Sequence, residues 1–177
     1  FGVRSESSAP LEEGVIFEKM EQSGLSDFPI ANVVISEPSE VTFIAVGDIM
    51  LSRDTARKMK KYDNINYPFL EVSDFLKTGD IVFGNLESPI TAGREIHSSD
   101  MVFRADPGVE TALKDAGFTI LSLANNHSPN FGADGLRDTF QYLRDAGVSY
   151  VGAGENDTEA YSPVFIEKNG MKLEEVK

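Results

Sequence analysis

Three short polar motifs stand at the ends of the strongest apolar runs of this 177-residue chain. Gly47-Asp48 follows the first run, Asn85 and Glu87 follow the second, and Asn126-His127 follows the third. Carboxylate and amide oxygens together with a neutral imidazole suit Mn²⁺, Fe²⁺ or Zn²⁺ better than Ca²⁺ or a thiophilic metal. We therefore expect a divalent-metal site, provided that the fold brings the three motifs together.

Each motif also has a structural explanation when it is taken alone. A Gly-Asp pair is a common turn, so Asp48 could cap the helix that follows it. Asn85 could bond its own backbone in a polar loop, although residues two apart in extended backbone point to the same side, which lets Asn85 and Glu87 face one site. An isolated histidine such as His127 is more often structural than a ligand. The case for function rests on the shared position of the motifs at strand ends.

Two arginines accompany these motifs. Arg53 comes shortly after the first one, and Arg104 precedes a helix that begins at Pro107. A guanidinium group binds a phosphate or carboxylate through two parallel hydrogen bonds, so either arginine could bind an anionic group of a substrate. A surface ion pair explains each arginine equally well. The second histidine, His97, lies in a polar segment and is expected on the surface.

From residue 41 onward, predicted strands alternate with predicted helices. The strands are expected at 41–46, 80–83, 118–124 and 148–151, with a short one at 101–105, and the helices at 52–61, 68–77, 107–116 and 133–146. Asn169-Gly170 predicts a hairpin between two further strands. This alternation is typical of right-handed βαβ crossovers and a largely parallel sheet. Such a sheet carries its chemistry on the loops at the carboxyl ends of its strands, where the three motifs lie.

Residues 1–40 have a different composition, with eight acids, two bases and three prolines. We expect them to form an acidic lead segment or linker, with at most one edge strand at 30–35, ahead of a domain that spans 41–177. The whole chain has a formal charge of −13, which argues against binding to nucleic acid and against charge-driven docking on an anionic membrane. The absence of cysteine excludes disulfides and thiolate metal sites.

No apolar run approaches the roughly 20 residues that a membrane helix needs. Membrane attachment is therefore expected only through an anchor that has been removed or lies outside this chain. Because the first residue is not Met, the chain is expected to be a cut or processed product.

Four motifs, in this order and spacing, resemble the CapA family of bacterial capsule and poly-γ-glutamate synthesis proteins, which is related to the calcineurin-like metallophosphoesterases. The motifs are Gly47-Asp48-Ile49-Met50, Gly84-Asn85-Leu86-Glu87-Ser88-Pro89, Phe103-Arg104-Ala105 and Ala124-Asn125-Asn126-His127. The resemblance covers residues 41–172 and leaves residues 1–40 outside.

The resemblance implies an α/β fold, a metallophosphatase-like αββα sandwich, with a centre for one or two ions of Mn, Fe or Zn. By motif matching, Asp48 would bind the first metal, with Asn85 beside it, and Glu87 would bridge the metals. Asn126 would be a ligand or a donor to the transition state, and His127 a ligand, an acid or an orienting group. Two metals would lower the pKa of bound water and clamp an oxyanion. A cell-surface or other extracytoplasmic location follows from the family alone.

The chain departs from the family pattern in two ways. Asn130 stands where the family usually has an aspartate two residues before a glycine, which removes a charge near His127. No histidine follows His127, so the chain is expected to hold only the N-terminal part of the sandwich, without the half that completes the metal site. An uncovered apolar sheet face would then favour association with that half or with a second copy.

Three interpretations remain open at this point. The chain is a metal-dependent hydrolase of phosphoester or amide bonds, a non-catalytic cell-surface module that binds or anchors an anionic polymer, or a remnant that needs its other half or a dimer partner. The incomplete ligand set favours the second interpretation. The net charge of −13 disfavours it unless Arg53, Arg104 or a metal supplies local positive potential.

Overall fold

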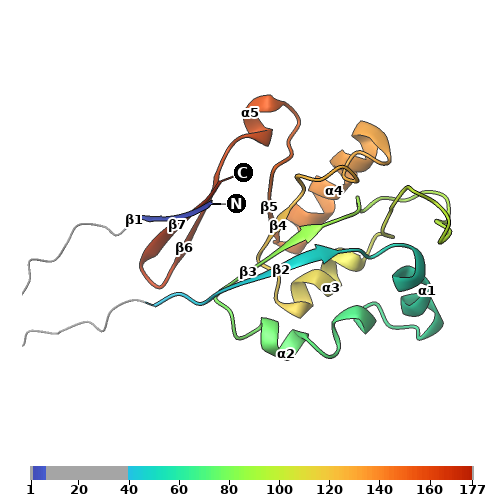
Figure 1. Cartoon of the computed structure of the whole chain (residues 1–177), viewed down its shortest axis with the longest axis horizontal. Coiled ribbons are helices and arrows are strands. Elements are labelled where there is room, and N and C mark those ends of the chain that lie inside the picture. The colour runs from blue at the N-terminus through green and yellow to red at the C-terminus, as the bar shows by residue number, and fades with distance from the viewer. Residues whose placement is uncertain (1, 7–39, 177) are drawn as a thin grey trace, which may run out of the picture.

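The computed structural model describes residues 2–6 and 40–176 and contains a four-stranded parallel sheet (Figure 1). The strands follow one another across the sheet in chain order. They are β2 (Phe43–Ile49), β3 (Ile81–Leu86), β4 (Ile120–Ser122) and β5 (Ser149–Val151). Each pair of neighbours is parallel, with helical crossovers between them, so the predicted α/β class is confirmed.

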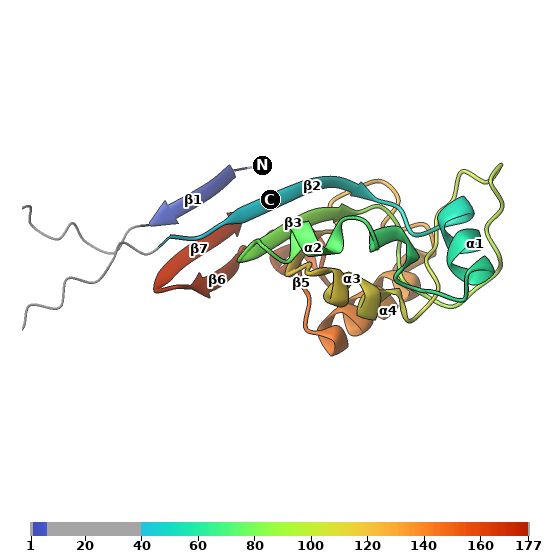
Figure 2. The same ribbon diagram turned by 90° about the horizontal axis from the view of Figure 1, so that it is seen from below.

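Helices α3 and α4 pack on one face of this sheet, and α1 lies beyond one end of it (Figure 2). The helical segments are α1 (Arg53–Lys61), the 3₁₀ turn η1 (Tyr67–Phe69), α2 (Ser73–Leu76), α3 (Val109–Ala116), α4 (Gly132–Ala146) and α5 (Asp157–Ala160). The main core lies between sheet and helices, where Leu113, Leu121 and Phe140 are almost completely buried. Each such side chain contributes about 2 kcal/mol through the apolar surface that it removes from water.

Two predicted elements differ from the structure. The helix predicted at 68–77 is broken into η1 and α2, because the backbone turns between Phe69 and Val72 instead of continuing as one helix. The strand predicted at 101–105 is a single bridge between Ile90 and Ala105. No longer strand forms there because the backbone N–H groups of Phe103 and Arg104 donate to the side chains of Asn130 and Ser52 instead of to a neighbouring strand.

A second, antiparallel sheet has the order β1 (Gly2–Glu6), β7 (Met171–Val176), β6 (Val164–Lys168). The predicted hairpin is confirmed, since Asn169 and Gly170 connect β6 to β7 with φ values of 51° and 76°. The strand at residues 2–6 was not predicted, and the strand predicted at 30–35 lies outside the described residues.

The second face of the parallel sheet is covered over its inner strands. Ile81, Phe83 and Ile120 are at most 5% exposed there, and Val164 and Ile166 of β6 pack against them. The expectation of an uncovered apolar face is therefore wrong for these strands. It holds for β2, the edge strand of the parallel sheet, where Phe43 stacks on Phe83 and is 38% exposed. Among the described residues, no helix is long and apolar enough to cross a membrane.

Candidate functional site

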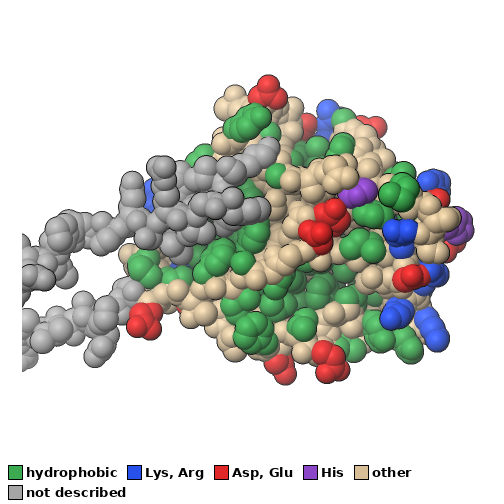
Figure 3. Space-filling view, viewed as in Figure 1, with side chains coloured by type: hydrophobic (Ala, Val, Ile, Leu, Met, Phe, Trp, Pro, Cys, Tyr) green, Lys and Arg blue, Asp and Glu red, His purple; other side chains and the backbone are tan. Residues whose placement is uncertain are grey.

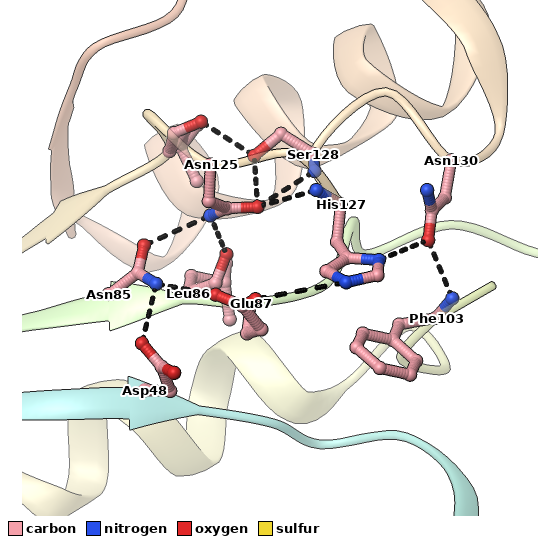
Figure 4. A network of polar contacts seen from close by, with 10 residues as sticks. Asp48, Asn85, Leu86, Glu87, Phe103, Asn125, His127, Ser128 and Asn130 are labelled. Carbon is pink, nitrogen blue, oxygen red and sulfur yellow. Dashed lines mark hydrogen bonds and ion pairs between the residues drawn. The ribbon is translucent and has the colours of Figure 1, made fainter. Parts of the chain in front are cut away.

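The fold brings the three polar motifs to one edge of the parallel sheet (Figure 4). Asp48 on β2 lies opposite Asn85 on β3, and Asn85 lies opposite Ser122 at the end of β4. A β-bulge between Ala45 and Asp48 shifts the register of β2 against β3 just before the first motif. Bulges redirect the side chains that follow them, and the Asp48 carboxylate, directly after this shift, accepts a hydrogen bond from Asn85 of β3.

The Asn85 side-chain amide joins the two carboxylates. Its Nδ2 atom donates to Asp48 Oδ1 at 2.8 Å and also donates to Glu87 Oε2. Its Oδ1 atom accepts a hydrogen bond from Asn125 Nδ2 at 3.0 Å. The two negative charges therefore share one partially positive amide group between them.

Asn125 fixes the orientation of this amide. Its Nδ2 donates to the backbone oxygen of Leu86 at 2.9 Å, and its Oδ1 accepts from the backbone N–H groups of His127 and Ser128 at 3.0 and 2.9 Å. If the Asn125 amide were rotated by about 180°, its NH₂ group would face the N–H donors of His127 and Ser128. Only the present orientation therefore allows all of these hydrogen bonds. Asn85 must then present its oxygen to Asn125 and its nitrogen to the carboxylates. Asn85 is therefore a donor to both carboxylates in this arrangement, and its expected role as a metal ligand stays a prediction.

Asn126 and Asn125 have contrasting environments although they are neighbours. Asn126 is exposed and takes part in none of the hydrogen bonds found among the described residues. Asn125, which was not among the predicted site residues, makes hydrogen bonds to Asn85, Leu86, His127 and Ser128. The signal that could have identified it is its place two residues before His127, the spacing at which an asparagine caps following backbone N–H groups in an Asx turn.

His127 is held in one tautomer. Asn130 Oδ1 accepts the backbone N–H of Phe103 at 2.7 Å, which identifies this atom as the amide oxygen. The Nδ1 atom of His127 lies 3.0 Å from the same oxygen, so a neutral imidazole here carries its proton on Nδ1 and its lone pair on Nε2. That Nε2 atom lies 3.9 Å from Glu87 Oε1. Asn130 thus supplies the oxygen acceptor that an aspartate would supply at this position.

The two arginines expected to bind substrate have different environments. Arg104 is 5% exposed, and its guanidinium donates to the backbone oxygens of Thr91 and Arg94 and to Asp106 Oδ1 at 2.7, 3.0 and 2.7 Å. These contacts hold the Arg104 guanidinium in the interior, and its expected role in binding an anionic group of the substrate stays a prediction. Arg53 is partly buried, lies 5.4 Å from the centre of the Phe103 ring, and has no carboxylate partner among the described residues.

Asp106 remains charged beside Arg104. Burial is the largest single influence on the pKa of Asp106 and raises it. Lys60 and Arg104 oppose this effect through their hydrogen bonds and positive charges. Together they lower the pKa below its ordinary value of 3.8. The ionised carboxylate therefore anchors Arg104 over the neutral pH range.

The donor chemistry of the site suits a divalent metal, although the side chains do not yet surround one point. Within residues 2–6 and 40–176, no three His, Cys, Asp or Glu side chains converge as a metal-binding group. Glu87 and His127 nevertheless face one another with side chains 16% and 15% exposed, and Asp48 is tied to Glu87 through one amide. A carboxylate and an imidazole are donor types that Mn, Fe and Zn accept, so the chemistry of these side chains is compatible with the expected ion.

Comparison with known proteins identifies the family. The family model described as bacterial capsule synthesis protein PGA_cap matches residues 42–176. The chain is 37% identical over 153 residues to the capsule biosynthesis protein CapA of Bacillus anthracis, covering 81% of this chain and 36% of that protein. It is 32% identical over 133 residues to the PGA biosynthesis protein CapA of Bacillus subtilis (strain 168), covering 72% and 34%.

A shorter match, 41% identical over 76 residues, is to a probable polyglutamine synthesis accessory protein of Mycobacterium tuberculosis, covering 42% of this chain and 20% of that protein. The chain spans about a third of the length of the two Bacillus relatives. The four-stranded parallel sheet agrees with the metallophosphatase-like α/β fold that the motifs implied. By its family match and its relatives, this chain belongs to the CapA family of bacterial capsule and poly-γ-glutamate biosynthesis proteins.

Proposed function

We propose that this chain is a metal-dependent hydrolase of phosphoester or amide bonds that acts in capsule or poly-γ-glutamate biosynthesis at the cell surface. The observation that carries the proposal is the facing pair of Glu87 and His127 Nε2, 3.9 Å apart, at the carboxyl edge of a parallel sheet. The names of the two Bacillus relatives support the biological setting.

Asp48, Glu87 and His127 would hold the metal. A bound ion of this kind lowers the pKa of a coordinated water toward neutrality and stabilises a developing oxyanion. The protein's own residues prepare the site for it. Asn85 holds both carboxylates through its NH₂ group. Asn130 keeps the proton of His127 on Nδ1, so that Nε2 is free to coordinate or to accept a proton.

Two further residues would contact the substrate. Exposed Asn126 precedes His127 in the chain and would donate its amide to an oxygen of the reacting group. Arg53 lies over the Phe103 ring, and that ring packs on His127 with the two ring centres 4.0 Å apart. Its guanidinium, which has no carboxylate partner among the described residues, would bind a phosphate or carboxylate of the substrate.

Removal of the Glu87 charge tests the proposal. The chain is loaded with Mn²⁺ or Zn²⁺ and assayed with a nitrophenyl phosphoester and a γ-glutamyl nitroanilide. We expect Glu87→Gln to lower kcat by about 100-fold for whichever of the two substrates the native chain hydrolyses. The variant loses a carboxylate that would bind the metal directly.

The matched control is Glu167→Gln, which removes the same charge from an exposed position on β6, in the other sheet. It is expected to keep the activity of the native chain. Equal rates for the native chain and Glu87→Gln, with either metal, would rule out hydrolysis at this site.

A further inference from the structure

Helix α1 places a dense group of cations on an acidic protein. Five of its nine residues are basic and one is acidic, whereas the whole chain has a formal charge of −13. Figure 3 shows basic side chains gathered at the end of the molecule where α1 lies, beyond the acidic side chains at the centre of the same face. An open hollow of about 800 Å³ lies against this helix and is lined by Asp54, Arg57, Lys58, Lys60, Lys61 and Glu95.

Part of this charge is neutralised within the protein and part is not. Arg57 pairs with Asp54, and Lys60 pairs with Asp106 at 3.0 Å. Lys58 and Lys61 are exposed, and neither has an acidic partner among the described residues. Their positive potential is therefore available to a ligand in the hollow.

The helix dipole explains only some of these cations. Lysines in the last turn of α1 are stabilised by the partial negative charge at a helix C-terminus. The same dipole opposes Arg53, which is the first residue of the helix and has a φ of 55° in the left-handed region. A cation kept at an electrostatically and sterically unfavourable position indicates a role outside helix stability.

Arg53 also connects the hollow to the candidate metal site. Arg53, Arg57 and Lys60 line one small crevice together, and Arg57 and Lys60 line the hollow as well. On its other side, Arg53 contacts the Phe103 ring that packs on His127. Arg53 therefore lies between the cations of the hollow and the aromatic ring that packs on His127.

We propose that the α1 surface, defined by Arg53, Arg57, Lys58, Lys60 and Lys61, binds a polycarboxylate chain and guides it to the strand-end site. The choice of carboxylates over phosphates rests on the proposed function in poly-γ-glutamate biosynthesis. Successive carboxylates of an acidic polypeptide would pair with Lys58 and Lys61 in the hollow and with Arg53 near His127. An acidic protein can bind a polyanion at this surface, because binding depends more on the electrostatic potential close to the ligand than on the net charge of the whole protein.

The experiment measures binding of fluorescently labelled poly-γ-glutamate to the whole chain in EDTA at about 20 mM salt, where exposed charge pairs are weakly screened. The test variant is Lys58→Gln with Lys61→Gln. The control is Lys77→Gln with Lys168→Gln, two exposed lysines outside α1. Each variant loses two positive charges, so both change the net charge from −13 to −15. Thermal melts of both variants confirm that they are folded.

We expect the α1 variant to bind the polymer about tenfold more weakly and the control to stay within about twofold of the native chain. Equal weakening in both variants, or no binding by the native chain, would overturn the proposal. Tighter binding to single-stranded DNA or to phosphatidylglycerol vesicles than to the polymer would overturn the assignment to carboxylates. Because EDTA removes metal, polymer binding that depends on α1 supports this surface even if the hydrolase proposal fails.

Discussion

Replacing Asn125 by alanine is expected to lower the free energy of unfolding by about 3 kcal/mol. The change removes the acceptor for the backbone N–H groups of His127 and Ser128 and the donor to Leu86 and Asn85. Partly buried groups that lose their partners bear a desolvation cost that exceeds the average value of a hydrogen bond. Urea unfolding monitored by circular dichroism measures the difference.

The neighbouring Asn126→Ala is the matched control, because it removes the same side chain from the adjacent exposed position. It is expected to change the free energy of unfolding by less than about 0.5 kcal/mol. Similar losses in the two variants would contradict the assignment of the network to Asn125. Such a result would also remove the argument that fixes the orientation of the Asn85 amide.

Replacing Arg104 by methionine is expected to lower the free energy of unfolding by about 2–3 kcal/mol. Methionine keeps much of the apolar length of the side chain but leaves the backbone oxygens of Thr91 and Arg94 without their donor. It also removes a cation that lowers the pKa of Asp106. A carboxylate with a lowered pKa stabilises the fold above the pKa of the unfolded chain and loses this contribution as the pH falls through the folded-state pKa. The loss caused by the variant should therefore become smaller below about pH 4.

Arg53→Met is the control for Arg104→Met, since the sequence motifs gave both arginines the same role. It removes a cation over an aromatic ring and is expected to cost less than about 1 kcal/mol. A larger loss for Arg53→Met than for Arg104→Met in the same urea titration would contradict the roles that the structure gives to the two arginines.

The sequence predicted the sheet and the meeting of the motifs because both follow from local rules. Apolar runs that end in Gly-Asp or Gly-Asn and alternate with capped helices specify a parallel sheet. Parallel strands place their carboxyl ends at one edge, which brings Asp48, Glu87 and His127 together. The hairpin at Asn169-Gly170 was predicted for a similar reason, because both residues tolerate a left-handed backbone.

The partners of individual side chains could not be predicted from the sequence. Asn125 and Asn126 are identical in type and adjacent, and only the turn after β4 decides which one faces the backbone of His127. Arg104 is interior because the segment around Thr91 folds over it, a contact between residues 13 positions apart. The edge position of β2 could not be predicted either, since a continuous apolar run is typical of a strand that is buried on both faces, whereas β2 pairs with β3 alone in the parallel sheet.

Metal content after loading tests the central claim that the three strand ends form a metal site. The native chain, His127→Ala and His97→Ala are incubated with Mn²⁺, Fe²⁺ or Zn²⁺, freed of excess metal and examined by elemental analysis. His97 is exposed and lies outside the strand ends, so its variant controls for adventitious binding to histidine. We predict near-stoichiometric metal in the native chain and in His97→Ala, and a loss of that metal in His127→Ala. Absence of metal from the native chain, or its full retention in His127→Ala, would contradict the account.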